Sequence, residues 1–197
     1  MWTGMLALAA TGEVRDPQTC RWSPHDPGST VVSRDGLSFF SLVSRGVTVQ
    51  ASVQDTGHEI RVDVRVENRS EASIPIDPAA LGFEILSPKF KQLKFEPAEK
   101  VASGYLTVAT STDAMSNGAT FNRTPRSSEN ELAQREAARV RQTALRPMSL
   151  PPNEAVAGVV YFEREKKKEE TLLRMPVGKV IFEFPFAWSG GQVSGPR

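Results

Sequence analysis

The stretch EIRVDVRVEN, Glu59–Asn68, decides the fold that we predict for this chain of 197 residues. Apolar side chains occupy every second position of the stretch, and charged side chains fill the positions between them. The apolar set is Ile60, Val62, Val64 and Val66, and the charged set is Arg61, Asp63, Arg65 and Glu67. A period of two residues is typical of a β-strand with one face on a core and the other in water.

The neighbouring segments extend this strand into a sheet. Val47–Val53 alternates in the same way, and Asp55-Thr56-Gly57 is a turn signal, so we predict a hairpin with the strand that follows. Leu37–Val43 is predicted to be the first strand. After a proline-rich bend, Leu81–Leu86 is predicted to be another strand, with Leu81, Phe83 and Ile85 on one face.

Three shorter segments are also predicted to be strands. Pro75 removes a backbone donor, so Ile74–Ile76 is expected at a sheet edge or at the start of a strand. Phe90–Phe95 places lysines between apolar residues, which is typical of an exposed edge strand that could add to a partner's sheet. Tyr105–Val108 is predicted to be one more short strand.

The last third of the chain returns to strands. In AVAGVVYFE, Ala155–Glu163, we expect Val156, Val160 and Phe162 on one face and Val159 and Tyr161 on the other. Lys166–Lys168 is predicted to be the polar tip of a hairpin. The closing strand, KVIFEFPF, carries four apolar side chains on one face: Val180, Phe182, Phe184 and Phe186. Each such side chain contributes about 1.5–3 kcal/mol when fully buried.

One helix interrupts the strands. Residues 109–128 lack a period and are predicted to be a flexible loop. Ser128 and Glu131 have the spacing of a capping box, so a helix is expected over Glu129–Leu145, ended by Pro147. Its apolar stripe is thin and consists of Leu132, Ala133, Ala137, Val140 and Ala144. Such a helix is expected to ride on the sheets or to project from them.

The composition of the chain limits the classes of function that we expect for it. Fourteen prolines and 14 glycines suit a loop-rich all-β protein, and a formal net charge of +1 gives no global field that would attract nucleic acid. The single cysteine, Cys20, cannot form an internal disulfide. The apolar run Met5–Ala10 and the triplet Ala7-Leu8-Ala9 are similar to part of an export signal, so we expect a periplasmic or extracellular protein. No stretch approaches the ~20 apolar residues of a membrane-spanning helix.

Two stretches resemble a known class of domain. VDVRVENRSEASIPIDPAALGFEI, and LPPNEAVAGVVYFE followed by KVIFEFPF, are similar to the paired strands of Ig-like domains in bacterial exported proteins and lipoproteins. The resemblance covers about residues 47–96 and 150–188, and the segment 109–146 departs from it as an insertion. It implies an all-β, Ig-like antiparallel sandwich of about seven strands that acts as an accessory or binding module. It supplies no site residues.

Few residues point to chemistry. Cys20, His25 and Asp26 are possible metal or redox ligands within seven residues, but a metal site usually needs a second close pair of ligands. His58 lies in a hairpin turn and is expected to be solvated. No phosphate-binding loop, G-x-S-x-G or H-E-x-x-H motif is present. We therefore assign no catalytic, cofactor-binding or metal-binding residue and expect no enzymatic activity.

A basic bias in the insertion gives a second alternative. Its arginines are Arg123, Arg126, Arg135, Arg139, Arg141 and Arg146. They suit either an arm that touches an acidic partner or nucleic acid, or a solvated helix with mixed charge pairs. We favour the second interpretation, because modules that bind nucleic acid add stacking aromatic residues and a larger charge excess.

The sequence therefore predicts three regions. Residues 1–36 form a lead-in with a partial signal segment, residues 37–188 form one Ig-like domain with a loop and helix inserted at 109–146, and residues 189–197 form a flexible tail. The predicted function is binding to a protein or to an envelope component. The alternatives are a metal or redox protein using Cys20 and His25, and a binder of acidic partners or nucleic acid using the arginine helix.

Overall fold

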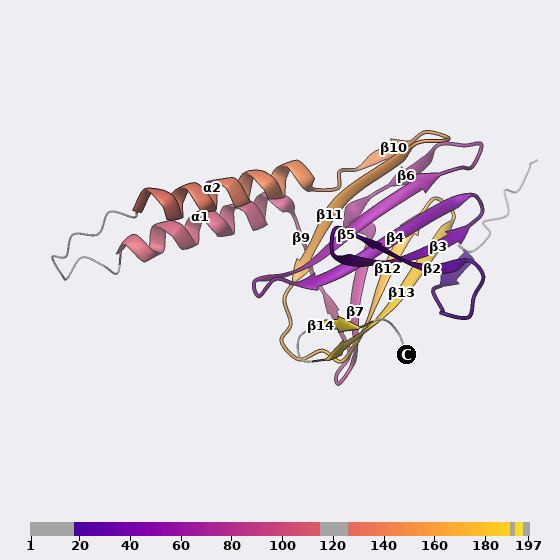
Figure 1. Ribbon diagram of the computed structural model, residues 1–197, viewed down its shortest axis with the longest axis horizontal. Coiled ribbons are helices and arrows are strands. Elements are labelled where there is room, and N and C mark those ends of the chain that lie inside the picture. Colours follow the sequence, from indigo (N-terminus) through magenta and orange to yellow (C-terminus); the bar gives the residue numbers. More distant parts are fainter. Residues whose placement is uncertain (1–17, 115–125, 190–191, 195–197) are drawn as a thin grey trace, which may run out of the picture.

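The computed structural model describes residues 18–114, 126–189 and 192–194, which form two packed β-sheets and a pair of helices (Figure 1). The first sheet contains, in order, β1 (Gln18–Arg21), β13 (Val180–Ser189), β12 (Glu170–Val177), β7 (Gly82–Ser87) and β8 (Lys91–Leu93), with β14 (Gln192–Ser194) also paired to β13. The second sheet contains β2 (Ser29–Arg34), β3 (Leu37–Ser44), β4 (Val47–Asp55), β5 (Glu59–Asn68), β11 (Ala155–Glu163) and β9 (Phe95–Glu96). A separate pair consists of β6 (Ile74–Ile76) and β10 (Met148–Leu150), and a short 3-10 helix spans Pro78–Ala80.

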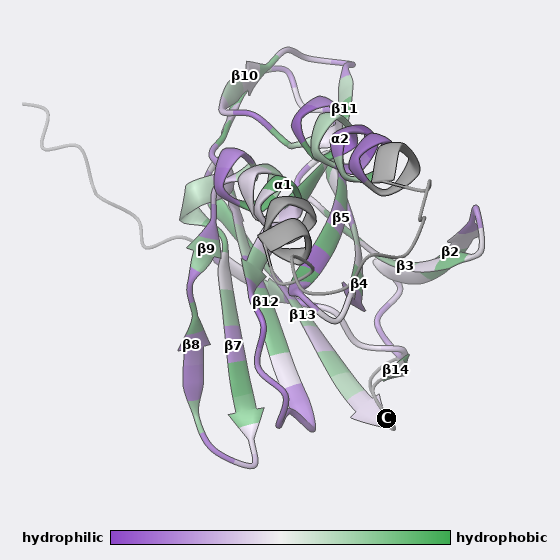
Figure 2. Cartoon of the chain, turned by 90° about the vertical axis from the view of Figure 1, so that its left-hand side faces the viewer, coloured by the Kyte–Doolittle hydropathy of each residue, from purple (hydrophilic) through white to green (hydrophobic). Residues whose placement is uncertain are grey.

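The main core lies between the two sheets. Its largest fully buried side chains include Phe83, Phe162, Phe182, Phe184 and Phe186. Figure 2 shows hydrophobic residues along β7, β12 and β13. The all-β sandwich predicted from the sequence is confirmed, and so are the inward-facing positions that we assigned to the closing strand.

The predicted hairpin of the deciding strand is also confirmed. β4 and β5 pair antiparallel, with Val53 opposite Val62. The two preceding hairpins, β2–β3 and β3–β4, close with the two-residue turns Asp35-Gly36 and Arg45-Gly46. All four of these residues have positive φ angles. Two successive positive φ angles define the type I′ turn, which matches the twist of paired strands.

The chain contains more strands than we predicted, and they reach into both predicted tails. β1 and β2 lie within residues 18–36, which we predicted to be an irregular lead-in. β1 pairs parallel to β13 in the first sheet and β2 pairs with β3 in the second, so the lead-in contributes to both sheets. At the other end, β14 lies within the predicted flexible tail and pairs with β13. These strands are short and flanked by proline or glycine, so alternation gives little signal for them.

The segment Phe90–Phe95 is not one edge strand. β8 lies at the edge of the first sheet, and β9 pairs with β11 in the second. The chain therefore crosses between the sheets at Lys94, which breaks the apparent strand. The predicted edge position holds for β8, where Phe90 beside it is 64% exposed.

The prediction for the insertion needs two corrections. Tyr105–Val108 is not a strand, because it lies within helix α1 (Ala98–Ala114). Helix α2 (Arg126–Thr143) begins upstream of Ser128, so the predicted capping box does not start the helix. The inserted structure begins at Ala98 rather than at residue 109. Residues 115–125 of the predicted loop lie outside the described residues, as does the signal-like segment 1–10.

Candidate functional site

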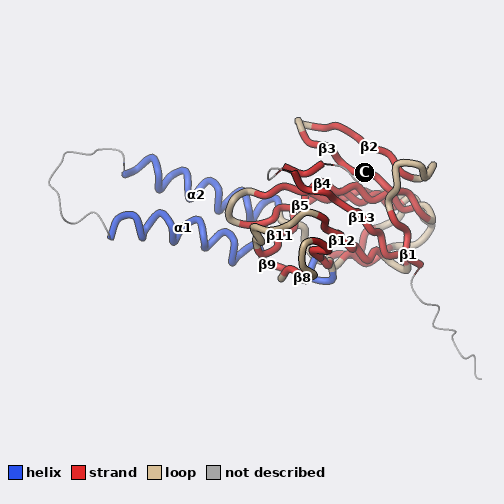
Figure 3. The backbone as a smooth tube through the Cα atoms, turned by 90° about the horizontal axis from the view of Figure 1, so that it is seen from below, coloured by secondary structure: helices blue, strands red, loops and turns tan. Residues whose placement is uncertain are grey.

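The two helices together form a projection that we call the helical arm. α1 and α2 lie side by side and extend away from the sandwich (Figures 1 and 3). The predicted projection of the helix from the sheets is thus observed, although the projecting unit is a pair. None of the helices in the described part of the chain is long and apolar enough to span a membrane.

A narrow seam of small side chains holds the arm together. Ala102 of α1 and Ala137 and Val140 of α2 are buried in it. Ala98, Val101, Tyr105 and Leu106 of α1 pack beside them. Two positions predicted for the apolar stripe, Ala137 and Val140, are therefore buried, Ala133 and Ala144 are half-buried, and Leu132 is 59% exposed.

The arm is attached to the outer face of β11. Val159 and Tyr161, which we predicted on the face opposite Val160, are buried against the arm instead of against the main core. The link after α2 lies directly on the strand, where Leu145 N–H donates to the Val159 carbonyl at 2.9 Å. A Cβ atom at Gly158 would lie 2.6 Å from Leu145 Cα, so only glycine permits this approach.

A partly buried hydrogen bond reinforces the attachment. The Tyr105 hydroxyl of α1 donates to Glu59 Oε1 of β5 at 3.1 Å, and Glu59 is only 8% exposed. Burial, together with the nearby negative charge of Glu59, raises the pKa of Tyr105 to about 12. Burial also raises the pKa of Tyr161. Both phenols are therefore neutral at physiological pH and hold the arm in place rather than exchange protons.

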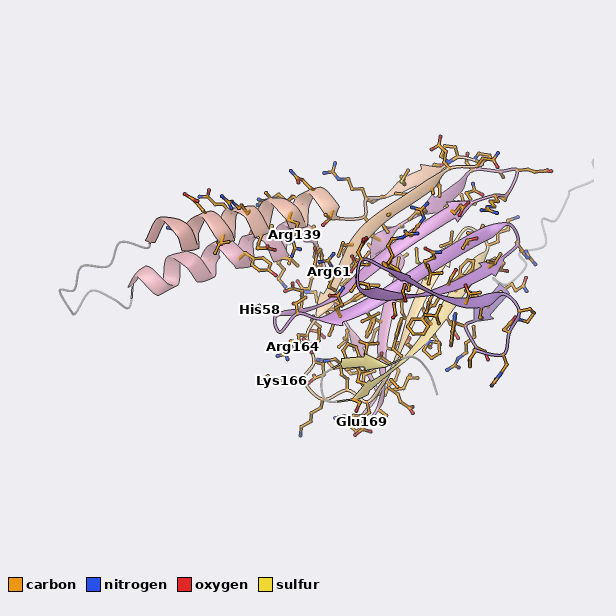
Figure 4. All side chains as sticks on the ribbon, viewed as in Figure 1. His58, Arg61, Arg139, Arg164, Lys166 and Glu169 are labelled. Carbon is orange, nitrogen blue, oxygen red and sulfur yellow. The ribbon has the colours of Figure 1, made fainter. Side chains whose placement is uncertain are left out.

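Polar and charged side chains line the junction between the arm and the sandwich. Figure 4 shows His58, Arg61, Arg139, Arg164 and Lys166 from the root of the arm down the adjoining end of the sandwich. Arg61 Nη2 pairs with Asp63 at 2.6 Å, while its buried Nε has no hydrogen-bond partner among the described residues. Burial alone would lower the pKa of Arg61, but Asp63 raises it, so the guanidinium stays charged.

Further along this row, one buried carboxylate ties the end of β4 to the segment that crosses between the two sheets. Asp55, the last residue of β4, accepts hydrogen bonds from Lys168 Nζ and, at 2.7 Å, from Arg164 Nε. Burial would raise the pKa of Asp55, but the hydrogen bonds from Lys168, Arg164 and the Gly57 N–H lower it overall. The carboxylate therefore remains ionised well into the acidic range.

Lys168 corrects another prediction. Residues 164–169 are not the tip of a hairpin, because β11 and β12 belong to different sheets and this segment crosses between them. The Lys168 side chain is 3% exposed, and its Nζ lies 4.4 Å from the centroid of the Trp188 ring. Lys166 and Lys167 are exposed, as expected.

Three arginines of the arm are in ion pairs. Arg139 contacts Glu136 at 2.6 Å, and Arg141 contacts Glu99 of α1 at 2.8 Å. Arg135 lies 3.7 Å from Glu131. Arg123 lies outside the described residues. These pairs match the mixed-charge interpretation of the helix, whereas Arg146, just after α2, is exposed and has no ion pair among the described residues. The side chain of Arg126 is not described.

The alternative metal or redox residues do not assemble into a site. Cys20, in β1, lies with its Sγ 3.2 Å from Ser44 Oγ, and His25 is exposed in the loop that follows. His58 is exposed, as predicted, with its ring 6.4 Å from the Tyr105 ring. Residues 18–114, 126–189 and 192–194 contain no group of three side chains placed to hold a metal ion.

A pocket of about 510 Å³ lies away from the arm, near the ends of β1, β12 and β13. Its walls include Arg21, Glu170 and the apolar side chains of Leu86 and Pro185. Arg21 and Glu170 are exposed, and the one buried polar side chain among the lining residues, Thr171, accepts a hydrogen bond from Trp188 Nε1 at 2.9 Å.

The chain matches no protein-family model, no curated protein and no solved structure. The candidate site is therefore defined by its geometry alone: the helical arm and the row of charges at its root. The sequence signal that could have revealed α1 is the spacing of Ala98, Val101, Ala102, Tyr105 and Leu106, which repeats every three to four residues.

Proposed function

We propose that this protein is an exported, non-catalytic Ig-like module that binds a protein or an envelope component through its helical arm. The compartment rests on the signal-like run Met5–Ala10, and the absence of catalysis rests on the missing motifs. The arm as the contact element is supported by its place in the fold.

The order of the strands supports the Ig-like assignment. An Ig domain of the constant type has strands A, B, E and D in one sheet and C, F and G in the other. Here β4, β5, β11 and β9 are neighbours in that first order, and β7, β12 and β13 are neighbours in the second. β8 then takes the place of strand C′. β2 and β3 extend the first set beyond strand A, and the arm is inserted between D and E.

One observation supports the arm as the element that contacts a partner. None of the described side chains of α1 or α2 belongs to the main core, which is made from the strands and the segments beside them. The arm instead forms its own small cluster with Val159 and Tyr161. The main core does not need this projection, yet Gly158 and Tyr105 fix it at a set position. Such a projection is suited to reach a partner.

The arm also presents an apolar contact point. Leu132 is one of six large apolar residues that are conspicuously exposed in the described chain. Charged side chains surround it on α2, so the surface has the apolar centre and polar rim of a small binding patch.

Site-specific photocrosslinking in the cells that produce the protein tests this proposal. A photoreactive phenylalanine analogue replaces Leu132 in one variant and Phe90, at the β8 edge, in the matched control. The two positions have similar exposure, 59% and 64%. We expect a discrete adduct from position 132 and none from position 90. An adduct from position 90 alone would assign binding to the strand edge, and no adduct from position 132 would refute the arm as the contact element.

A further inference from the structure

The outer edge of β2 is an open strand edge at the opposite side of the second sheet from the arm. β2 has six residues, and among the described strands it pairs only with β3. Figures 2 and 3 show the β2–β3 hairpin at the margin of the sandwich. Val31, near the middle of β2, is 52% exposed.

The register shows which backbone groups face outward. Val43 N–H donates to the Gly28 carbonyl at 3.0 Å, and Arg34 and Leu37 flank the two-residue turn. In an antiparallel pair, hydrogen-bonded positions alternate along the strand, so even-numbered residues of β2 bond to β3. The N–H and C=O groups of Val31 and Ser33 therefore point away from β3. The described residues provide no backbone partner for these four groups.

Two other edge strands of the described chain, β8 and β9, are protected, whereas β2 is not. β8 is three residues long and carries Lys91, which pairs with Glu165 at 3.1 Å. β9 is two residues long and leads into Pro97 and the arm. Short strands, lysine and proline are the features by which proteins block unwanted pairing. In contrast, Ser29–Ser33 has no charge and no proline, and its centre is Val31-Val32.

We infer that β2 pairs antiparallel with β2 of a second copy of this chain, about a two-fold axis at Val32. In this register, Val31 lies opposite Ser33 of the other copy, and the four free groups of each chain are satisfied together. Arg34 lies opposite Thr30, so no like charges face each other. Val32 lies opposite its own equivalent at a position where side chains approach closely.

The register makes a specific cysteine test possible. In a Cys20→Ser background, Val32→Cys places two thiols at a non-hydrogen-bonded pair, with Cα atoms about 4.5 Å apart. That separation suits a disulfide. The matched control is Val31→Cys, whose two copies would lie about 8 Å apart and too far to bridge. Under mild oxidation, we expect a disulfide-linked dimer from Val32→Cys and at least tenfold less from Val31→Cys. Equal yields from the two variants would overturn the register.

Sedimentation of the unmodified chain supplies an independent measurement. The apparent mass should rise from 21.6 kDa towards twice that value as concentration increases. Ser33→Pro removes an outward N–H and leaves the hydrogen bonds between β2 and β3 intact. Val31→Lys, which places a charge on the open edge that opposes strand pairing, serves as a second variant in case the proline variant fails to fold. We expect either folded variant to stay monomeric. A wild-type chain that remains at 21.6 kDa throughout, or a folded variant that still dimerises, would overturn the inference.

Discussion

Replacing Lys168 by methionine should destabilise the fold strongly, although the residue lies in a run of three lysines. Its Nζ donates to the Asp55 carboxylate and, at 2.9 Å, to the Glu165 carbonyl, and it lies over the Trp188 ring. Methionine keeps most of the side-chain volume, so the substitution removes these polar interactions without leaving a large cavity.

The size of the effect follows from what remains around Asp55. Removing one partner of a buried ion pair costs about 3–5 kcal/mol, because the other charge is left buried and unpaired. Asp55 is 7% exposed, but Arg164 and the Gly57 N–H still reach it. We therefore expect a loss near the lower limit, about 3 kcal/mol in the free energy of unfolding.

Chemical denaturation followed by far-ultraviolet circular dichroism measures this loss without relying on the fluorescence of Trp188. The matched control is Lys167→Met, which changes an exposed neighbour and should alter stability by less than about 0.5 kcal/mol. In a double-mutant cycle with Asp55→Asn, the two substitutions together should cost about 2 kcal/mol less than the sum of each alone. Equal stability of the Lys167 and Lys168 variants would refute the buried position of Lys168.

Three further predictions test the ion pair and the attachment of the arm. Folding lowers the pKa of Asp55, so its ionised form stabilises the protein above about pH 4, the pKa of a free carboxyl group. This contribution is lost as the pH falls through the pKa of the folded state. Measurements of stability against pH should show this loss in the wild type and not in Asp55→Asn. Gly158→Ala should cost about 1–3 kcal/mol and shift spin-label distances between arm and sandwich, because the new Cβ would clash with Leu145. Tyr105→Phe should cost about 1–3 kcal/mol by leaving Glu59 buried without that hydrogen bond, and ultraviolet titration should lose the tyrosine that ionises near pH 12 in the wild type.

The sandwich could be predicted from the sequence because its strands bury one face each. Ile60 to Val66 and Val180 to Phe186 alternate without interruption, and the structure buries the apolar side chains of both runs. In β11, Val160 and Phe162 enter the main core and Val159 and Tyr161 face the arm, as the two apolar faces of that strand indicate. A strand that is apolar on both faces is covered on both faces.

The attachment of the arm could not be predicted, because it depends on contacts between residues far apart in the chain. Tyr105 reaches Glu59 across 46 positions, and Lys168 reaches Asp55 across 113. Lys166, Lys167 and Lys168 are identical in type, so only the path of the crossover decides which of them is buried. Helix α1 was misassigned for a local reason: Gly104 and several β-branched residues weaken its helical signal.

The position of the arm in the second sheet makes the proposed binding and the inferred pairing compatible. β9 and β11 are hydrogen-bonded neighbours, so an insertion between them leaves the order of the remaining strands unchanged. β2 lies at the other end of the same sheet, separated from β11 by β3, β4 and β5. Two chains joined at β2 therefore keep the arm-bearing edges of their sheets away from the joint. Because the two surfaces share no residue, a substitution at Ser33 should leave crosslinking from Leu132 intact, and a substitution at Leu132 should leave the mass of the pair unchanged.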